Sequence, residues 1–121
     1  MPPHWVNFLA AHNLIGREVS ISESADRSGV GVDMEFLNEA DSLSELQDAY
    51  PGLAVVADGF VPVGSCLIGS GDPYFINLAD GEGGPLYRIY HDSVSEHGYD
   101  RSTAVAVVLE DYRELLQYLT I

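Results

Sequence analysis

The sequence predicts an α+β fold with a mixed, mainly antiparallel sheet of about five to six strands, flanked by N-terminal, middle and C-terminal helices. Short apolar runs, rich in β-branched residues and bounded by glycine or proline, recur as strands do. Three other stretches space their apolar residues three and four positions apart, which is typical of amphipathic helices. Two aromatic runs joined by a glycine-rich loop between Tyr74 and His91 predict an antiparallel hairpin. The 121 residues are expected to form a single domain, 1–121.

The N-terminal third is expected to hold a helix followed by two strands. Pro3–His12 is predicted as the helix, because prolines suit a first helical turn and Asn13 suits a helix stop. Its apolar stripe consists of Trp5, Phe8, Leu9 and His12. Arg17–Ile21 and Gly31–Leu37 alternate as strands, and the polar residues between them, Ser22–Gly31, are predicted as an exposed loop. The second strand is expected to point Val32, Met34 and Phe36 inwards.

The middle of the chain is expected to form a second helix over Leu43–Tyr50. Ser42 and Glu45 match a capping box, in which the serine caps a backbone N–H and the glutamate reaches back. The expected buried stripe is Leu43, Leu46 and Tyr50. Pro51-Gly52 then ends the helix, and the short apolar run Leu53–Val56 predicts a further strand.

The stretch Phe60–His91 contains the centre of the predicted sheet. Strands are predicted over Val61–Ile68, Tyr74–Leu78 and Leu86–His91. Gly69–Pro73 is predicted as a turn, because it leads into a strand and offers no helix N-terminus that could hold a phosphate. Cys66 is the single cysteine, which excludes an intrachain disulfide, and a buried inert thiol is expected there.

The end of the chain is expected to alternate loop, strand and helix. Asp92–Ser102 is polar and predicted as a solvated loop. Thr103–Val108 is apolar and β-branched, which predicts a central strand or one buried on both faces. Leu109–Leu119 is predicted as the terminal helix, with Glu110 and Asp111 in its first turn, where carboxylates complement the helix dipole.

The charge of the chain is strongly acidic. There are 19 aspartates and glutamates against five arginines and no lysine, which gives a net charge of −14. Such a surface repels nucleic-acid phosphates and anionic lipid and attracts basic proteins, so neither a nucleic-acid nor a membrane partner is expected. The alternative is that the acidity only keeps the protein soluble, or reflects a salty habitat or an acid-biased proteome. The sequence contains neither a secretory signal pattern nor a long apolar run, so a cytoplasmic location is expected.

Four landmarks in a fixed order resemble the SUKH superfamily of Smi/Knr-like domains. The first is the aromatic helix Trp5–Asn13. The second is the strand Val61-Pro62-Val63-Gly64, followed closely by the turn and strand Gly71-Asp72-Pro73-Tyr74-Phe75. The third is the strand entry Gly84-Pro85-Leu86-Tyr87 with His91-Asp92 at its end, and the last is the strand-then-helix finish Val105–Leu119. The chain departs from the family pattern after Asn13, where Leu14 and Ile15 replace two glycines, and at Tyr112, where phenylalanine is frequent.

The resemblance implies a sheet flanked by helices and no catalysis. It implies a non-enzymatic immunity protein, which neutralises a cognate polymorphic toxin, often a basic nuclease, by direct binding. The alternative implied by the same family is a regulatory protein-interaction module without a toxin partner. A small hydrolase or metal-dependent enzyme is the third possibility.

Surface acids and aromatic residues near the central loops are the candidate partner-binding residues. They are Asp72, Tyr74, Asp80, Glu82, Tyr90, Asp92, Glu96 and Asp100. A patch that combines aromatic anchors with charges at its rim suits a protein interface. The alternative for the two tyrosines is a place in the core, and for the acids a role in solvating loops.

No catalytic residue, metal ligand or cofactor is predicted. A hydrolase would need an activated serine or cysteine beside a histidine and an orienting acid, and no nucleophile elbow accompanies the four histidines. His91-Asp92 and Glu96-His97 could supply metal ligands, but their spacing matches no established motif.

Overall fold

The computed structural model describes residues 1–48, 52–67 and 72–120, and the predictions made for Tyr50, Pro51 and residues 68–71 lie outside them. The helices are α1 (Pro3–His12), α2 (Glu39–Asp48), α3 (Gly52–Val55) and α4 (Arg101–Ala104), with 3₁₀ turns η1 (Val56–Asp58), η2 (Leu78–Asp80), η3 (His91–Ser93) and η4 (Tyr112–Tyr118). The strands are β1 (Glu18–Ile21), β2 (Val32–Phe36), β3 (Phe60–Cys66), β4 (Tyr74–Asn77), β5 (Leu86–Ile89), β6 (Val94–Ser95), β7 (Gly98–Tyr99) and β8 (Val105–Leu109).

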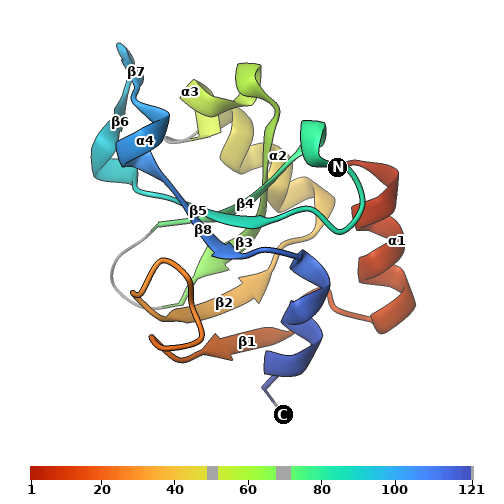
Figure 1. Ribbon diagram of the computed structural model, residues 1–121. Coiled ribbons are helices and arrows are strands. Elements are labelled where there is room, and N and C mark those ends of the chain that lie inside the picture. The colour runs from red at the N-terminus through yellow and green to blue at the C-terminus, as the bar shows by residue number, and fades with distance from the viewer. Residues whose placement is uncertain (49–51, 68–71, 121) are drawn as a thin grey trace.

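Six strands form one sheet in the order β1-β2-β3-β4-β5-β8, which confirms the α+β class and the expected strand number (Figure 1). Every pairing within this sheet is antiparallel. The predicted aromatic hairpin is β4–β5, in which Tyr74 lies opposite Arg88 and Phe75 opposite Tyr87. β6 and β7 form a separate two-stranded hairpin that projects from the body of the molecule (Figure 1).

At both edges of this sheet, the edge strand is hydrogen-bonded by a segment from elsewhere in the chain. Leu119 bridges to Val19 of β1, and the Thr120 N–H donates to the Glu18 carbonyl at 2.9 Å. The loop between β1 and β2 reaches the other edge, where the Arg27 N–H donates to the Val108 carbonyl of β8 at 2.9 Å. These bonds satisfy edge groups that would otherwise be open to another strand.

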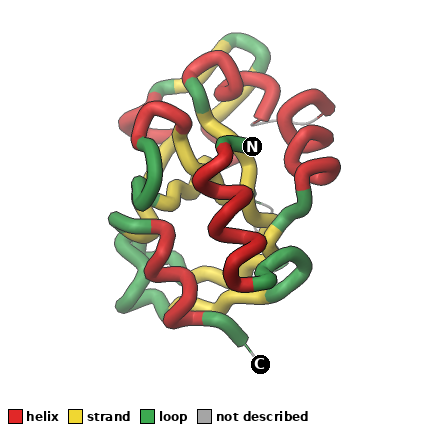
Figure 2. Tube along the Cα trace, turned by 90° about the vertical axis from the view of Figure 1, so that its right-hand side faces the viewer, coloured by secondary structure: helices red, strands yellow, loops and turns green. Residues whose placement is uncertain are grey.

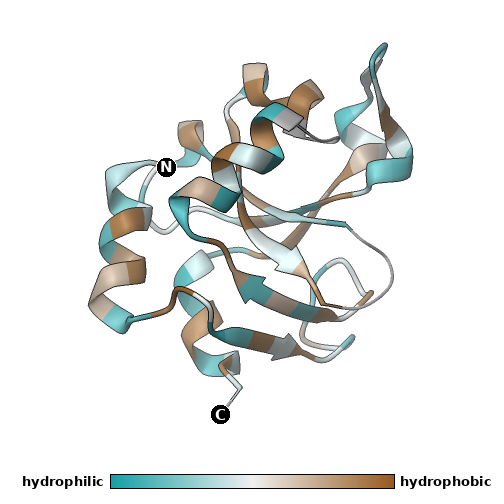
Figure 3. Ribbon diagram, turned by 180° about the vertical axis from the view of Figure 1, so that it is seen from behind, coloured by the Kyte–Doolittle hydropathy of each residue, from teal (hydrophilic) through white to brown (hydrophobic). Residues whose placement is uncertain are grey.

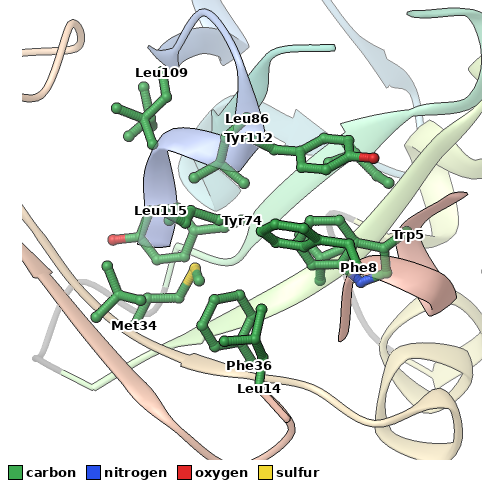
Figure 4. Packing of buried hydrophobic residues seen from close by; sticks show 14 of the residues in the cluster. Trp5, Phe8, Leu14, Met34, Phe36, Tyr74, Leu86, Leu109, Tyr112 and Leu115 are labelled. Atoms are coloured by element: carbon green, nitrogen blue, oxygen red, sulfur yellow. The ribbon is translucent and has the colours of Figure 1, made fainter. Parts of the chain in front are cut away.

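Both faces of the sheet carry an apolar core. One cluster contains Trp5 and Phe8 of α1 and Tyr112 and Leu115 of η4, as Figure 4 shows. The other contains Val55, Phe60, Phe75, Tyr87, Ile89, Val94 and Ala104. Successive side chains of a strand point to opposite faces, so Tyr74 and Ile76 lie in the first cluster while Phe75 lies in the second. All four residues of β4 are therefore buried.

A close contact between β2 and β3 requires a glycine. The β3–β4 register shifts between Pro62 and Gly64, and Gly64 lies opposite Phe36 of β2. A Cβ at Gly64 would lie 2.2 Å from the Met34 sulfur, and Met34 is fully buried. The glycine thus leaves the space that the Met34 side chain fills.

The loop between β1 and β2 is not wholly exposed, contrary to the prediction for Ser22–Gly31. Asp26 is buried, and its carboxylate accepts hydrogen bonds from the Ser28 N–H at 2.7 Å and the Gly31 N–H at 2.9 Å. It also forms an ion pair at 3.2 Å with the guanidinium of Arg88 from β5, whose side chain is 1% exposed. This pair holds the loop against the sheet.

The predicted start of the middle helix is wrong. α2 begins at Glu39, because the Asn38 side chain accepts the Asp41 N–H at 2.8 Å and so caps the helix earlier. Ser42 lies inside the helix and donates its hydroxyl to the Pro62 carbonyl of β3 at 2.6 Å. Leu43, expected to be buried, is 52% exposed.

Four further segments differ from the prediction. Leu53–Val56 is helical rather than extended, in α3 and the start of η1. β8 is an edge strand instead of a central one, and η4 replaces the terminal α-helix with a 3₁₀ helix. η4 begins after Asp111, which forms a capping box with Glu114. The segment Asp92–Ser102, predicted as loop, holds part of η3, the β6–β7 hairpin and the start of α4.

Candidate functional site

Exposed acidic residues occur on the β6–β7 hairpin and on the neighbouring turns. These elements lie towards the top of the view in Figure 1. We call this surface the acidic end and define it by the carboxylates Asp58, Asp80, Asp92, Glu96 and Asp100. They come from η1, η2, η3, the hairpin and the residue before α4. The chain therefore returns to this end several times.

Short-range hydrogen bonds shape the turns that carry these acids. Asp100 caps α4, accepting the Ser102 N–H at 2.9 Å and the Ser102 hydroxyl at 2.7 Å. Gly98 follows the exposed tip of the hairpin and has a φ of 107°, a value that residues other than glycine rarely adopt. Asn77 caps η2 and also donates its amide to the Asp58 carbonyl at 3.0 Å, which joins η1 to η2.

Two tyrosines connect the acids to the core beneath them. The Tyr87 hydroxyl donates to the Asp80 carboxylate at 2.7 Å, and the Tyr99 hydroxyl donates to the Asp58 carboxylate. The guanidinium of Arg101 lies 5.1 Å from the Phe60 ring and 5.9 Å from the Tyr87 ring. These are distances at which a cation is attracted by an aromatic face. The acidic end is therefore backed by aromatic side chains and an arginine.

Burial and the hydrogen-bonded carboxylates raise the pKa values of the Tyr87 and Tyr99 phenols. Desolvation raises the pKa of Tyr87 to about 12, with its hydrogen bond to Asp80 as the next cause. Desolvation likewise raises the pKa of Tyr99 to about 12, helped by the hydrogen bond to Asp58. Both hydroxyls thus stay protonated and continue to donate across the neutral pH range.

Spectrophotometric titration should detect these phenols. A tyrosine ordinarily ionises near pH 10, so the unfolded chain loses these protons before the folded chain does. Their contribution to stability is complete below about pH 10 and declines as the pH rises through about 12. Tyr99→Phe should remove one tyrosine from the late phase of the 295 nm absorbance change.

The matched control for this titration keeps the phenol. Asp58→Asn should leave the total absorbance change intact and move one ionisation to lower pH, because the amide carries no negative charge to oppose the phenolate. A late phase that is unchanged in both variants would contradict the assignment of Tyr99.

Exposed apolar side chains adjoin the acidic end. Val56 of η1 is 46% exposed and Leu78 of η2 is 53% exposed. The two turns are joined by the Leu78 N–H, which donates to the Gly59 carbonyl at 2.9 Å. Apolar groups beside carboxylates and tyrosines form the mixture found in protein interfaces.

The predicted binding residues do not all lie at this surface. Asp80, Asp92, Glu96 and Asp100 are exposed parts of it, and Tyr90 is half-buried next to η3. Tyr74 is fully buried, so its alternative assignment to the core is correct and it cannot be a surface anchor. Its guanidinium neighbour is Arg88, 5.2 Å from the ring centre.

Asp72 and Glu82 have other surroundings. Asp72 is 7% exposed, and its carboxylate accepts the His91 N–H at 3.0 Å and pairs with the His91 ring. Glu82 is exposed but lines a separate polar hollow with His4, His12 and Tyr112. Neither carboxylate belongs to the acidic end.

Sequence reasoning missed four residues of this site: Asp58, Tyr87, Tyr99 and Arg101. Asp58 precedes a glycine, and this pair of residues signals only a turn. Tyr99 and Arg101 flank Asp100, so the run Tyr99-Asp100-Arg101 carried a local signal of mixed aromatic and charged character. The sequence around Tyr87 carried no such signal, because its hydrogen bond to Asp80 forms only when the loop between β4 and β5 folds back.

The histidines at the acidic end pair with acids. The His91 ring contacts both Asp72 and Asp92, the latter at 3.1 Å, and His97 contacts Glu96 at 3.4 Å. The part of the chain that the structure describes contains no group of three or more histidine, cysteine or acidic side chains placed to hold a metal ion.

In comparisons with known proteins, no family model, curated protein or solved structure matches the chain. Among the described residues, no helix has both the length and the apolar character needed to cross a membrane.

Proposed function

We propose that this protein is a non-enzymatic immunity protein of the SUKH type, which binds a basic toxin and blocks it by covering its active surface. The acidic end is the observation that carries the proposal. It presents carboxylates on several turns at one end of the molecule, with tyrosine, arginine and exposed apolar side chains beside them.

The acidity is not neutralised within the chain. Among the residues that the structure describes, arginines pair with acids at Arg27–Glu110, Arg88–Asp26 and Arg113–Asp111, whereas the chain has 19 acids in all. The remaining carboxylates create a field that attracts a positively charged protein and speeds encounter. A nuclease, whose active site must hold phosphates, has the complementary charge.

The shape of the acidic end would let it fit into a cleft on a partner protein. The β6–β7 hairpin projects beyond the sheet, as Figures 1 and 3 show from opposite sides. Glu96 is 75% exposed on this hairpin and Asp92 is 91% exposed close to its base. A projecting acidic hairpin can enter a basic active-site cleft, while Val56 and Leu78 provide apolar contact at its side.

Affinity capture from a lysate of the source organism tests the proposal. The tagged protein is washed at low and at high salt, and retained proteins are identified by mass spectrometry. The proposal predicts one basic protein that is retained in equal stoichiometry through the high-salt wash. Several partners that leave together at high salt would instead indicate a regulatory interaction module.

Charge reversal at the hairpin should weaken capture of that partner. Asp92→Lys with Glu96→Lys changes two exposed carboxylates that cap no helix, so folding should be preserved. The association rate should fall at least about tenfold at low salt, and its salt dependence should weaken. Stopped-flow or surface-binding kinetics measure both quantities.

The matched control is Glu18→Lys with Glu23→Lys. These residues are also exposed, lie on β1 and the loop after it, and change the net charge by the same amount. The control should retain most of the wild-type association rate. Equal losses in the two double variants would mean that net charge alone, and not the acidic end, attracts the partner.

A further inference from the structure

A histidine just before the β6–β7 hairpin lies between two carboxylates. His91 begins η3, which leads into β6 at the end of the molecule opposite the C-terminus (Figures 1 and 2). Its Nδ1 atom lies 2.5 Å from Asp72 Oδ1, and its Nε2 atom lies 3.1 Å from Asp92 Oδ1. Both nitrogens of one imidazole ring thus face an acid.

The backbone around this ring is held by hydrogen bonds. The Tyr90 N–H donates to the Ala104 carbonyl at 2.8 Å, and the Ser93 N–H donates to the Tyr90 carbonyl at 3.0 Å, which closes the η3 turn. The His91 N–H donates to Asp72 Oδ1 at 3.0 Å. The same carboxylate oxygen therefore accepts from the backbone of His91 and faces its ring.

Asp72 determines which ring nitrogen carries the proton in neutral His91. The Asp72 side chain is only 10% exposed, and its Oδ1 atom already accepts the His91 N–H. An acceptor that faces Nδ1 requires a hydrogen on Nδ1, and a neutral imidazole has only one N–H. Neutral His91 is thus expected to carry its proton on Nδ1 and to leave Nε2 unprotonated.

A second proton, on Nε2, then decides the contact with Asp92. An imidazolium donates from both nitrogens, so it can bond Asp72 and Asp92 at the same time. Without that proton, the Nε2 lone pair faces a carboxylate oxygen that has only lone pairs, and the contact becomes repulsive. The Asp92 side chain is 91% exposed, so it can turn into water at little cost in stability.

The other charged groups near η3 have partners of their own. α4 and β6 pack against η3. Arg101 of α4 lies over two aromatic rings, and Asp100 before it caps the helix. Glu96, which follows β6, pairs with His97 at 3.4 Å. Within the part of the chain that the structure describes, the acids paired with the His91 ring are the two named above.

We propose that His91 is a proton-dependent clasp, in which Asp72 positions the ring and the proton on Nε2 holds Asp92 of the acidic end. Histidine is the side chain whose charge ordinarily changes between about pH 5 and 8. On the acidic side of this change Asp92 is bonded and its charge is compensated, and on the basic side it is free. The effect on binding, a weaker attraction of a basic toxin at lower pH, rests on the proposed function.

Ring-nitrogen spectra of the free protein test the positioning by Asp72. Long-range ¹H–¹⁵N spectra at about pH 8.5, above the usual range of histidine, distinguish the two neutral tautomers. His91 should carry its proton on Nδ1. His97 is the internal control, because its side chain is 87% exposed and its Nε2 atom is the one near an acid. It should carry its proton on Nε2.

Asp72→Ala removes the acceptor and should return His91 to the tautomer of His97. The comparison within the wild-type protein decides the matter even if this variant does not fold. A wild-type His91 that carries its proton on Nε2 would overturn the proposal.

The side-chain carboxyl carbon of Asp92 reports the clasp directly. Its ¹³C resonance should shift over the same pH range in which the His91 ring changes its charge. His91→Gln should abolish this step, while the glutamine amide can still donate to Asp72. His97→Gln is the matched control and should leave the step unchanged.

A step of equal size in both glutamine variants would show that the proton on His91 does not hold Asp92. These measurements use the free protein, so their outcome is independent of whether a toxin is the partner. Failure of the proposed function would appear instead as the absence of a captured basic protein.

Discussion

Replacing Arg88 with methionine should lower the free energy of unfolding by about 3–5 kcal/mol, the usual effect of removing one partner from a buried ion pair. The Asp26 and Arg88 side chains are 0% and 1% exposed, so water screens this pair very little. Without the guanidinium, the Asp26 carboxylate would remain buried beside the apolar core. The bond from Arg88 to the Gly31 carbonyl would also be lost.

The expected loss is the penalty of leaving a buried acid without its counter-ion. Urea denaturation followed by circular dichroism measures it. Because the loop bonds from Ser28 and Gly31 also depend on Asp26, hydrogen exchange in residues 26–31 should speed up in the same variant. Retained slow exchange in the loop would show that Arg88 does not hold it.

A double-mutant cycle supplies the control. Asp26→Asn keeps the shape of the side chain and removes its charge, so Asp26→Asn with Arg88→Met should lose clearly less stability than the two single changes predict together. Simple additivity of the single losses would contradict an ion pair that stabilises the fold as a unit.

Replacing Trp5 with alanine should cost about 3–5 kcal/mol, the usual loss when a large buried aromatic side chain leaves a cavity. Trp5 is fully buried, and its ring centre lies 5.3 Å from that of Phe8 and 5.0 Å from that of Tyr112. Phe36 of β2 lies 6.2 Å away. Trp5 therefore joins α1, η4 and the sheet, and all three should loosen together.

The control for Trp5 exploits an unusual feature of its environment. Its indole N–H is buried and has no hydrogen-bond partner within the described structure. Trp5→Phe keeps an aromatic ring and removes this unsatisfied donor, so it should cost clearly less than Trp5→Ala. Chemical denaturation compares the two, and equal losses would contradict the view that ring packing dominates at this position.

Local patterns in the sequence sufficed for part of the fold. The predicted helix Pro3–His12 has the bounds of α1, because prolines and a left-handed Asn13 are signals that act within one turn. The alternation of Val32, Met34 and Phe36 was also confirmed, since β2 has one face in the core. The aromatic hairpin β4–β5 followed from two strands separated by a glycine-rich loop.

Contacts between distant segments decided the rest. Asp26 resembled a loop acid because its partner Arg88 is 62 residues away. Thr103–Val108 resembled a central strand because both of its faces are apolar, yet β8 lies at the edge of the sheet, where Arg27 of the first long loop bonds to it. The start of α2 was misplaced because two adequate caps, Asn38 and Ser42, compete and the second serves β3 instead.

The sequence predicted that the site would be acidic, but it did not predict most of the other residues that form it. Exposed acids such as Asp92 and Glu96 follow from polarity alone. Tyr74 was misassigned as a possible anchor because alternation along β4 cannot show that both faces of this strand are covered. The pairing of Tyr99 with Asp58 spans 41 residues, and only the folded chain brings them together.

Growth rescue is the most direct test of the central claim, that the acidic end neutralises a toxin by direct binding. The captured basic protein is expressed in a bacterial host alone, with wild-type protein, and with each of the two double charge-reversal variants. The account predicts arrested growth that wild type and the Glu18→Lys, Glu23→Lys control restore and the Asp92→Lys, Glu96→Lys variant does not. A partner that is harmless when expressed alone, or full rescue by the hairpin variant, would contradict it.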